Sequence, residues 1–309
     1  MKKIIITEFM DQVAVDSLSP DFSVLYNETL ADNPDTLLKE IRDADAIIVR
    51  NRTQVKRELL AAAEKLTVVG RLGVGMDNID QEVCRSRNIA VFPATGANDA
   101  AVAEYVVTSA LMLLRRSYLS AEKMKAGQWP RTELMGNEIG GKLLGLIGFG
   151  AIARETCRIA KALGMNVAAY DPFVSSEDPA WEMARPLSLE ELLSSADVIS
   201  LHVPLTPETR HLVNSETIAR MKEGVIVVNA ARGGVVDENA LLDGLKSGRI
   251  GGAAIDVFET EPLEADSGRR FEGITNLILT PHIGGVTIES NVRVSAVTAE
   301  NVRKALEAE

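Results

Sequence analysis

The sequence predicts an α/β protein with two domains, and three observations lead to this expectation. Short apolar runs alternate with helix-like segments along most of the chain, which is the rhythm of a parallel sheet with crossover helices. The 309 residues are enough for two domains of ordinary size. With 46% hydrophobic and 25% charged residues, the composition is that of a folded globular protein.

The apolar runs fall into two sets, four strands followed by six. A long helix at residues 99–116 separates the sets, and its second half is apolar almost all round. Such a helix must be covered, either between the domains or at a subunit interface. A last helix near 287–306 follows the second set and could return to the first domain. The predicted strands are 3–6, 23–26, 46–49 and 67–70, then 143–147, 167–170, 198–201, 225–229, 253–257 and 277–280.

An apolar strand runs directly into a glycine-rich turn and then into a helix. Gly148, Gly150 and Ala153 form the pattern Gly-x-Gly-x-x-Ala. Gly148 permits a sharp turn, Gly150 lets the backbone approach a pyrophosphate, and Ala153 packs the helix against the strand. The first N–H groups of the helix, around Ala151 and Ile152, would bind the phosphates. Alone, the pattern also fits an ordinary strand-to-helix turn.

Asp171 supplies the second part of a dinucleotide site. It ends the apolar stretch at 166–170 and lies 21 residues after Gly150. A carboxylate at this place accepts hydrogen bonds from the adenosine ribose hydroxyls and repels a 2′-phosphate. No Arg or Lys follows Asp171 until Arg185. The sequence therefore predicts a Rossmann domain that binds NAD rather than NADP.

Charge and hydropathy exclude several classes of function. The net charge of −11 would repel nucleic acid and anionic membranes. The longest apolar stretch, 105–114, is about half a membrane span. Cys84 and Cys157 form neither a metal-ligand pattern nor a disulfide framework. We expect a cytoplasmic protein without a metal, in which local cations bind any anionic ligand.

Three polar residues, Arg232, Glu261 and His282, follow strands of the second set. They can converge, because the carboxyl ends of parallel strands face one ligand crevice. Hydride transfer to a 2-oxo acid needs a cation for the carboxylate, which suits Arg232, and a proton donor for the developing alkoxide, which suits His282. A carboxylate such as Glu261 favours the protonated form of a neighbouring imidazole. His202 also ends a strand and is the less favoured alternative, among residues expected to line the adenine side.

Arg50 and Arg52 follow the strand at 46–49, at its ligand-facing end. Two guanidinium groups there could bind a second anionic group of the substrate, such as a phosphate, a sulfonate or a distal carboxylate. For at least one of them, a surface ion pair is the alternative. Arg131 is a further cation that a dimer partner could supply.

Six segments together resemble the D-2-hydroxyacid dehydrogenase family, in the right order and over essentially the whole chain. They are Val68–Asp80, Gly145–Ala153, His202–Thr209, Asn229–Gly234, Asp256–Pro262 and Pro281–Gly285. The resemblance implies NAD-dependent interconversion of a 2-hydroxy and a 2-oxo acid, with Arg232, Glu261 and His282 as catalytic residues. It further implies that Asp256 lies by the nicotinamide carboxamide and that the backbone of Gly73, Val74 and Gly75 holds the substrate carboxylate. The implied cofactor-lining residues are Val203, Pro204, Thr209, Ala230, Ala231, Gly284 and Gly285.

The resemblance also carries expectations about architecture and substrate. It implies a discontinuous, flavodoxin-like substrate domain at 1–97 and 286–309, which closes over a Rossmann domain at 98–285. Homodimers through the 99–116 region are usual in the family. The phosphoglycerate dehydrogenase branch is the most similar, and three segments resemble bacterial sulfolactate dehydrogenases: 8–11, 49–55 and 93–98. The leading substrates are therefore sulfolactate and 3-phosphoglycerate.

Two alternatives share this fold. One is a non-catalytic NAD-sensing scaffold or corepressor, which would have no need of the proton donor at His282. The other is a formate dehydrogenase, which resembles the same fold but has glutamine where Glu261 stands. The Arg–Glu–His set disfavours both.

Overall fold

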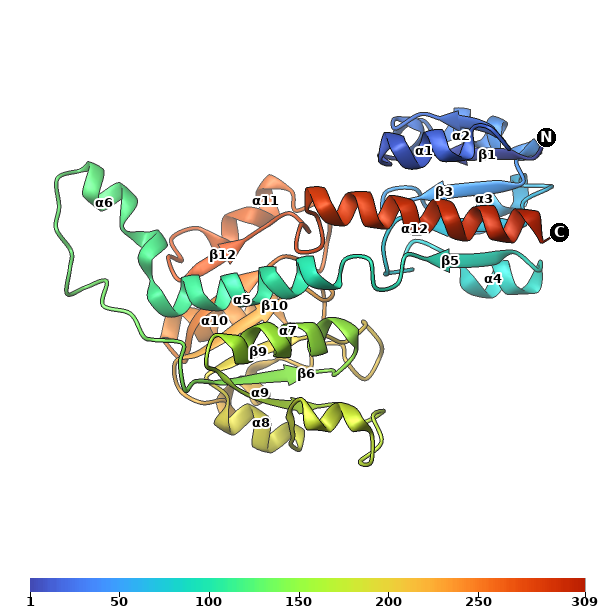
Figure 1. Cartoon of the computed structure of the whole chain (residues 1–309). Helices are drawn as coiled ribbons and strands as arrows, with labels where there is room; N and C mark the ends of the chain where they lie inside the picture. The colour runs from blue at the N-terminus through green and yellow to red at the C-terminus, as the bar shows by residue number, and fades with distance from the viewer. Residues whose placement is uncertain (309) are drawn as a thin grey trace. The chain divides into compact units, whose positions relative to one another are not determined.

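The computed structural model describes residues 1–308, which form two compact units. Unit 1 comprises Met1–Asn98 and the segment that begins at Thr287, and unit 2 comprises Asp99–Val286. Each unit has its own parallel sheet with helices on both faces (Figure 1). Within residues 1–308, no helix has the length and apolar character needed to cross a membrane.

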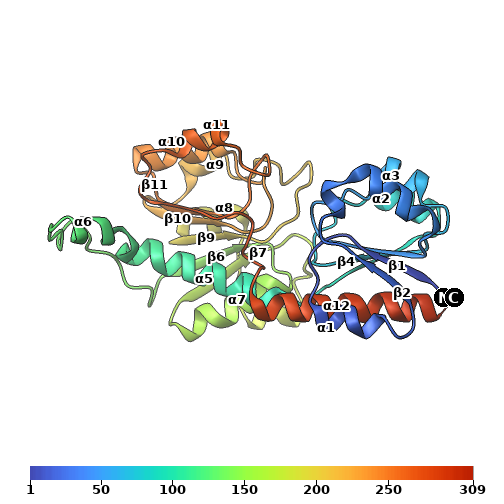
Figure 2. The ribbon, with the colours of Figure 1, turned by 90° about the horizontal axis from the view of Figure 1, so that it is seen from above.

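Unit 1 has a five-stranded parallel sheet in the order β2-β1-β3-β4-β5, the order of flavodoxin-like folds. Its elements are β1 (Lys3–Ile6), α1 (Gln12–Leu18), β2 (Ser23–Tyr26), η1 (Leu30–Asp32), α2 (Pro34–Glu40), η2 (Ile41–Asp43), β3 (Ala46–Val49), α3 (Arg57–Ala62), β4 (Val68–Arg71), α4 (Gln81–Ser86), β5 (Ala90–Pro93) and α12 (Ile288–Glu307). Helices α1 and α12 cover one face, and α2 and α3 cover the other (Figure 2). The sheet is buried on both sides, which is why its central strands are continuous apolar runs.

Helix α12 packs on β4 where the strand contains a glycine. A Cβ on Gly70 would lie 2.6 Å from Val302 Cγ2 and 2.9 Å from Thr298 Cγ2, so only glycine allows this approach. The helix begins with a capping box in which the Thr287 and Ser290 side chains accept from each other's backbone N–H groups. A helix from the far end of the described chain thus completes the core of unit 1.

Unit 2 has a seven-stranded parallel sheet in the order β12-β11-β10-β9-β6-β7-β8. The strand order reverses between β6 and β9, which is the switch point of a Rossmann sheet. Its elements are α5 (Asp99–Arg115), η3 (Ser117–Leu119), α6 (Ala121–Lys125), β6 (Leu143–Ile147), α7 (Ala151–Ala162), β7 (Asn166–Tyr170), η4 (Pro179–Glu182), β8 (Arg185–Pro186), α8 (Leu189–Ser195), β9 (Val198–Leu201), α9 (Ser215–Arg220), β10 (Val225–Asn229), α10 (Glu238–Ser247), β11 (Ile250–Ile255), α11 (Ala265–Gly268), η5 (Arg269–Phe271) and β12 (Leu277–Leu279). Helices α5 and α7 cover one face, and α8, α9 and α10 cover the other.

The predicted fold class is confirmed, and all ten predicted strands form within a few residues of their expected bounds. Two edge strands are additional. Strand β8 has only two residues, both exposed, and β5 is half-buried and ends in a proline. Neither has the continuous apolar character of a central parallel strand, so the pattern of the sequence does not reveal them.

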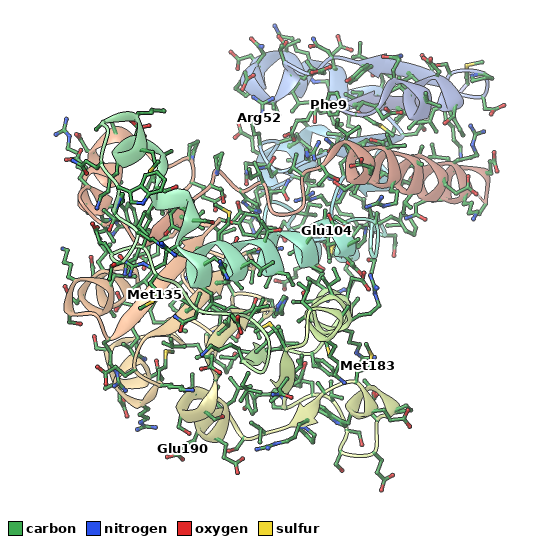
Figure 3. The ribbon with its side chains drawn as sticks, turned by 60° about the vertical axis from the view of Figure 1, so that its left-hand side comes forward. Phe9, Arg52, Glu104, Met135, Met183 and Glu190 are labelled. Carbon is green, nitrogen blue, oxygen red and sulfur yellow. The ribbon has the colours of Figure 1, made fainter. Side chains whose placement is uncertain are left out.

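The segment between α5 and β6 extends away from the sheet of unit 2 (Figure 1). Its two most exposed large apolar side chains are Trp129, at 77% exposure, and Met135, at 75%, the second of which is labelled in Figure 3. Arg131 lies between them and is also exposed. Its expected role toward a dimer partner, like the dimer itself, stays a prediction.

Candidate active site

The glycine turn after β6 has the geometry of a pyrophosphate-binding site. Gly148 has φ +90°, and a Cβ there would lie 2.5 Å from the His202 carbonyl oxygen. A Cβ on Gly150 would meet no heavy atom within 4 Å, so this position borders open space. Gly150 precedes α7, whose N-terminus has no side-chain cap, and Ala153 is fully buried. The first-turn N–H groups, those of Ala151 and Ile152 among them, therefore suit the phosphates of a dinucleotide.

Asp171 follows β7 and lines a cavity of about 310 Å³. Its two carboxylate oxygens accept hydrogen bonds from the backbone N–H groups of Phe149, at 2.8 Å, and Phe173, at 2.9 Å. These bonds fix the carboxylate beside the glycine turn, and each oxygen keeps a second lone pair. The residues thus fit the adenosine end of NAD.

His282 and Glu261 form a direct pair in unit 2. His282 Nδ1 lies 2.7 Å from Glu261 Oε2, and the two side chains are 42% and 31% exposed. Glu261 Oε1 accepts a hydrogen bond from Phe258 N–H at 2.9 Å. Nε2, the other imidazole nitrogen, is therefore the one that can face a substrate.

Arg232 lies close enough to act on the same pair electrostatically. Burial raises the pKa of the Glu261 carboxyl, but the hydrogen bonds from His282 and Phe258 N–H lower it. The positive charges of His282 and Arg232 act in the same direction, so the net pKa lies below its ordinary value. The structure therefore brings the predicted Arg–Glu–His set together and keeps Glu261 ionised.

Asp256 holds the backbone around His282. His282 has φ +57°, a left-handed conformation that is uncommon outside glycine. Its N–H donates to the Asp256 carbonyl at 2.8 Å. The buried Asp256 carboxylate accepts from Thr280 Oγ1 at 2.6 Å, from Ile283 N–H at 2.8 Å and from Gly284 N–H at 2.7 Å. Asp256 is thus tied to the histidine loop, and its implied contact with a carboxamide stays a prediction.

Gly233 brings the loop of Arg232 against the loop of Glu261. A Cβ on Gly233 would lie 1.7 Å from the Phe258 carbonyl oxygen and 2.2 Å from its carbon. The φ angle of Gly233 is ordinary, so glycine is required here by close approach and not by conformation. Sequence reasoning did not select Gly233, because nothing in its pattern distinguishes it from a turn glycine.

The remaining residues expected to line the cofactor lie in loops after β9, β10 and β12. Thr209 Oγ1 donates to the Pro204 carbonyl at 2.6 Å and accepts from Thr206 N–H at 2.7 Å, so it fixes its own loop. Asn229, which was not selected from the sequence, fixes the next loop, because its side chain accepts from Ala231 N–H at 3.1 Å. The other expected lining residues in these loops are Val203, Ala230, Gly284 and Gly285.

His202 has the wrong properties for a proton donor near neutral pH. Burial lowers its pKa from 6.5 to about 4, which leaves the imidazole neutral. Its Nε2 lies 2.9 Å from Ser200 Oγ. The environment of His202 therefore disfavours it as the proton donor, and the role of His282 stays a prediction.

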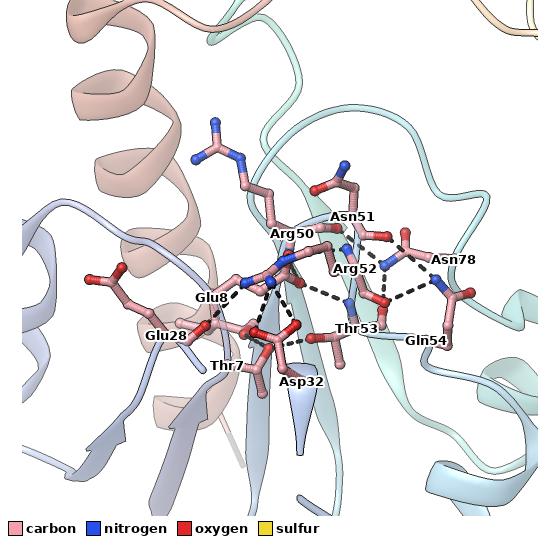
Figure 4. Close-up of polar contacts among 11 residues, drawn as sticks. Thr7, Glu8, Glu28, Asp32, Arg50, Asn51, Arg52, Thr53, Gln54 and Asn78 are labelled. Atoms are coloured by element: carbon pink, nitrogen blue, oxygen red, sulfur yellow. Dashed lines mark hydrogen bonds and ion pairs between the residues drawn. The ribbon is translucent and has the colours of Figure 1, made fainter. Parts of the chain in front are cut away.

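In unit 1, the side chains of the two arginines after β3 point in different directions (Figure 4). Arg52 pairs with the carboxylate of Asp32, with Nη1 2.7 Å and 2.9 Å from its two oxygens. The guanidinium of Arg50 points away from this pair and donates to Asn291 Oδ1 at 2.6 Å. Within residues 1–308, no carboxylate forms an ion pair with Arg50. The alternative of an ion pair thus applies to Arg52, whereas the charge of Arg50 is available.

Glu8 fixes the backbone that carries both arginines. Its carboxylate, 3% exposed, accepts from the N–H groups of Arg50, Arg52 and Thr53 at 2.9 to 3.0 Å. Burial raises the pKa of Glu8, but these hydrogen bonds lower it more, and the net pKa falls below its ordinary value. Burial also lowers the pKa of Arg50, and the charge of Glu8 opposes this. A buried carboxylate thus fixes the backbone from which the Arg50 side chain projects.

The turn Gly73-Val74-Gly75 follows β4 in the same unit. Gly73 has φ +141°, and its carbonyl accepts from Ala94 N–H at 2.9 Å. Over the described range 1–308, neither Val74 N–H nor Gly75 N–H donates a hydrogen bond. Two adjacent free N–H groups can bind a carboxylate.

Comparison with known proteins identifies the family. Residues 107–284 match the family model described as the NAD-binding domain of D-isomer specific 2-hydroxyacid dehydrogenases. The chain belongs to this family. It is an NAD-dependent 2-hydroxyacid dehydrogenase, and the resemblance seen in its motifs is confirmed.

Three relatives cover nearly all of this chain. An (S)-sulfolactate dehydrogenase from Chromohalobacter salexigens is 53% identical over 99% of both chains. A D-3-phosphoglycerate dehydrogenase from Methanocaldococcus jannaschii is 40% identical over 100% of this chain, which spans only 58% of that protein. The crystal structure of a D-lactate dehydrogenase from Aquifex aeolicus, complexed with NAD and lactic acid, is 30% identical, with a TM-score of 0.85 over 99% of this chain and 96% of that one. Membership of this enzyme family argues against a non-catalytic scaffold.

Proposed function

We propose that the protein interconverts a small 2-hydroxy acid that carries a second anionic group and the corresponding 2-oxo acid, with sulfolactate and 3-phosphoglycerate as leading substrates. The observation that carries this proposal is the guanidinium of Arg50, which donates to Asn291 Oδ1 and forms no ion pair with a carboxylate among residues 1–308, while Glu8 fixes its backbone. A partly buried cation without a carboxylate partner is costly unless an anion binds to it. Similarity to a sulfolactate dehydrogenase and to phosphoglycerate dehydrogenases supports the same substrate class.

In the proposed reaction, bound NAD would accept the hydride during oxidation and bound NADH would supply it during reduction, and residues of this chain carry the remaining chemistry. Arg232 binds the substrate carboxylate and polarises the 2-oxo group. His282 Nε2 donates a proton to the developing alkoxide during reduction and takes it back during oxidation. Glu261, ionised and bonded to Nδ1, orients the imidazole ring. The N–H groups of Gly73-Val74-Gly75 are a second proposed contact for the substrate carboxylate.

A substrate panel tests the proposal. Rates with NAD and NADP would be measured for both enantiomers of sulfolactate and for 3-phosphoglycerate, glycerate, lactate and malate. We expect kcat/KM to be highest for a substrate with a second anionic group and with NAD. Higher kcat/KM for lactate or glycerate than for every doubly anionic substrate would refute the proposed role of Arg50.

The catalytic roles are tested separately with His282→Asn and Arg232→Gln. Asparagine suits His282 because it tolerates the left-handed backbone that this position requires. Each variant should lose turnover by about 100-fold or more while it still binds NADH, as followed by NADH fluorescence. Full activity in His282→Asn would contradict the assignment of the proton donor.

A further inference from the structure

A cluster of charged residues lies beside the loop that carries Glu261. It consists of Glu238 at the start of α10, Glu259 in the loop after β11, Arg270 in η5 and His211 in the loop after β9. We refer to these four residues as the Glu238 cluster. None of them is among the residues predicted from the sequence or assigned a role in the reaction above.

The two glutamates of the cluster bind each other's backbones. Glu259 N–H donates to Glu238 Oε1 at 2.7 Å, and Glu238 N–H donates to Glu259 Oε1 at 3.4 Å. This reciprocal pair joins the start of α10 to the loop after β11. Each glutamate also has a nitrogen-bearing partner from another segment. Arg270 pairs with Glu238 Oε2, and His211 Nε2 lies 3.3 Å from Glu259 Oε1.

Burial makes the pair of Glu238 and Arg270 important for the position of the loop. The Glu238 side chain is 3% exposed and that of Arg270 is 33% exposed. The Arg270 guanidinium also lies over the Phe271 ring, 5.0 Å from its centroid. Removal of the arginine would leave a buried carboxylate without a cation, and that carboxylate would have to move toward water. Any such movement takes the bonded Glu259 backbone with it.

The Glu259 backbone leads directly to the Glu261 carboxylate. Phe258, the residue before Glu259, donates its N–H to Glu261 Oε1. Its ring packs edge-on against the Phe271 ring, with 6.1 Å between the two ring centroids. Glu261 Oε2 holds His282 Nδ1 at 2.7 Å. A continuous set of contacts therefore runs from Glu238 through the Glu259 backbone to the acid–base pair.

We propose that Glu238, charge-compensated by Arg270, is a positioning residue for the Glu261–His282 pair. It does not contact the reacting atoms. Its carboxylate fixes the Glu259 N–H group and with it the backbone that presents Glu261. This inference rests on the proposed roles of Glu261 and His282.

Three variants test the inference in the full-length enzyme with NADH and the best 2-oxo acid of the substrate panel. Arg270→Met removes the cation, and Glu238→Ala removes the acceptor for Glu259 N–H. We expect each to lower kcat by about 10- to 100-fold, because a displacement of roughly 1 Å at an active site has this effect. The KM for NADH should change little, since the glycine turn and Asp171 lie in other loops.

The double variant Glu238→Gln with Arg270→Met is the conservative rescue. Its glutamine keeps an acceptor for Glu259 N–H but carries no charge that needs Arg270. We expect kcat within about threefold of the parent enzyme. Arg220→Met is the matched control, because Arg220 pairs with Glu216 on the exposed surface of α9, where loss of an ion pair has little effect.

The pH profile of kcat/KM separates positioning from a general loss of stability. In the parent enzyme, the pKa of Glu261 is lowered by His282, by Phe258 N–H and by the charge of Arg232, against the opposing effect of burial. If the loop moves in Arg270→Met, the pKa of Glu261 rises, and its carboxylate protonates at higher pH. The acidic limb of the profile should then move to higher pH in this variant and stay in place in the control.

The outcomes are distinguishable. The inference is supported if the single variants lose at least tenfold in kcat, the acidic limb moves and the double variant recovers. It is overturned if a folded single variant stays within threefold of the parent in kcat, or if the double variant is as impaired as the singles. If Arg270→Met does not fold, Glu238→Ala and the double variant decide by the same criteria. Full activity in Glu261→Gln and His282→Asn would instead refute the proposed catalytic roles.

Discussion

Substitution of Gly233 by alanine should uncouple the loops of Arg232 and Glu261 without touching a reacting group. The added Cβ would lie 1.7 Å from the Phe258 carbonyl oxygen and 2.9 Å from Glu259 N. Because Cβ atoms essentially never approach other heavy atoms within 3.0 Å, the two backbones must separate by roughly 1.3 Å. Neither neighbour is a flexible side chain that could turn aside.

A separation of this size predicts a loss in kcat of about 10- to 100-fold, because catalytic groups must be held to within a fraction of an ångström. Steady-state kinetics would give kcat and KM, and circular dichroism would establish that the variant is folded. Gly140→Ala is the matched control, since a Cβ at Gly140 meets nothing within 4 Å and its φ is ordinary. A folded Gly233→Ala enzyme with the kcat of the parent would refute the reasoning.

Three further predictions concern other parts of the chain. Asp171→Ala should raise KM for NAD and reduce the preference for NAD over NADP, because the carboxylate that repels a 2′-phosphate is lost. An unchanged ratio of kcat/KM for the two cofactors would contradict this prediction. Arg50→Gln should raise KM at least tenfold for a doubly anionic substrate but not for lactate. Arg52→Gln should have a smaller effect on KM, because Arg52 already pairs with Asp32. Equal effects of the two variants would contradict the proposed role of Arg50. His202 has a pKa near 4 when folded and 6.5 when unfolded, so the unfolded chain binds its proton first and stability falls as pH drops from 6.5 to 4. The full shift corresponds to about 3 kcal/mol, and partial exposure reduces the expected loss to about 1–2 kcal/mol. Urea denaturation at pH 7.5 and 5 should show this loss in the parent and not in His202→Asn, and equal pH dependence in both would contradict it.

The strands and the contact between Glu261 and His282 were predictable because simple rules govern them. Central parallel strands such as β6 and β10 are continuous apolar runs, since both faces are covered. Glu261 and His282 both follow strands of one parallel sheet. Because the carboxyl ends of parallel strands meet at the same edge, their positions in the sequence were enough to predict that they lie together. The sequence was sufficient here because each feature depends on local pattern and strand order.

Other features depend on contacts between distant segments, and no local pattern encodes them. Arg52 and Asp32 are 20 residues apart, and only the fold makes them partners. Gly233 is required because the Phe258 carbonyl packs against it. Glu238 looks like any acidic residue in the first turn of a helix, where carboxylates are common. Its burial and its bond to Glu259 become visible only in three dimensions.

The return of α12 to unit 1 makes unit 2 an insertion within another folding unit. All strands and helices of unit 2 come from one uninterrupted stretch, Asp99–Val286. Unit 1 needs residues from both sides of that stretch. Strand β4 stays uncovered at Gly70 until α12 has been synthesised and packs there with Thr298 and Val302. During synthesis, the chain must therefore extend past Val302 before the N-terminal sheet can bury its last face. The inserted unit can already be folded by then.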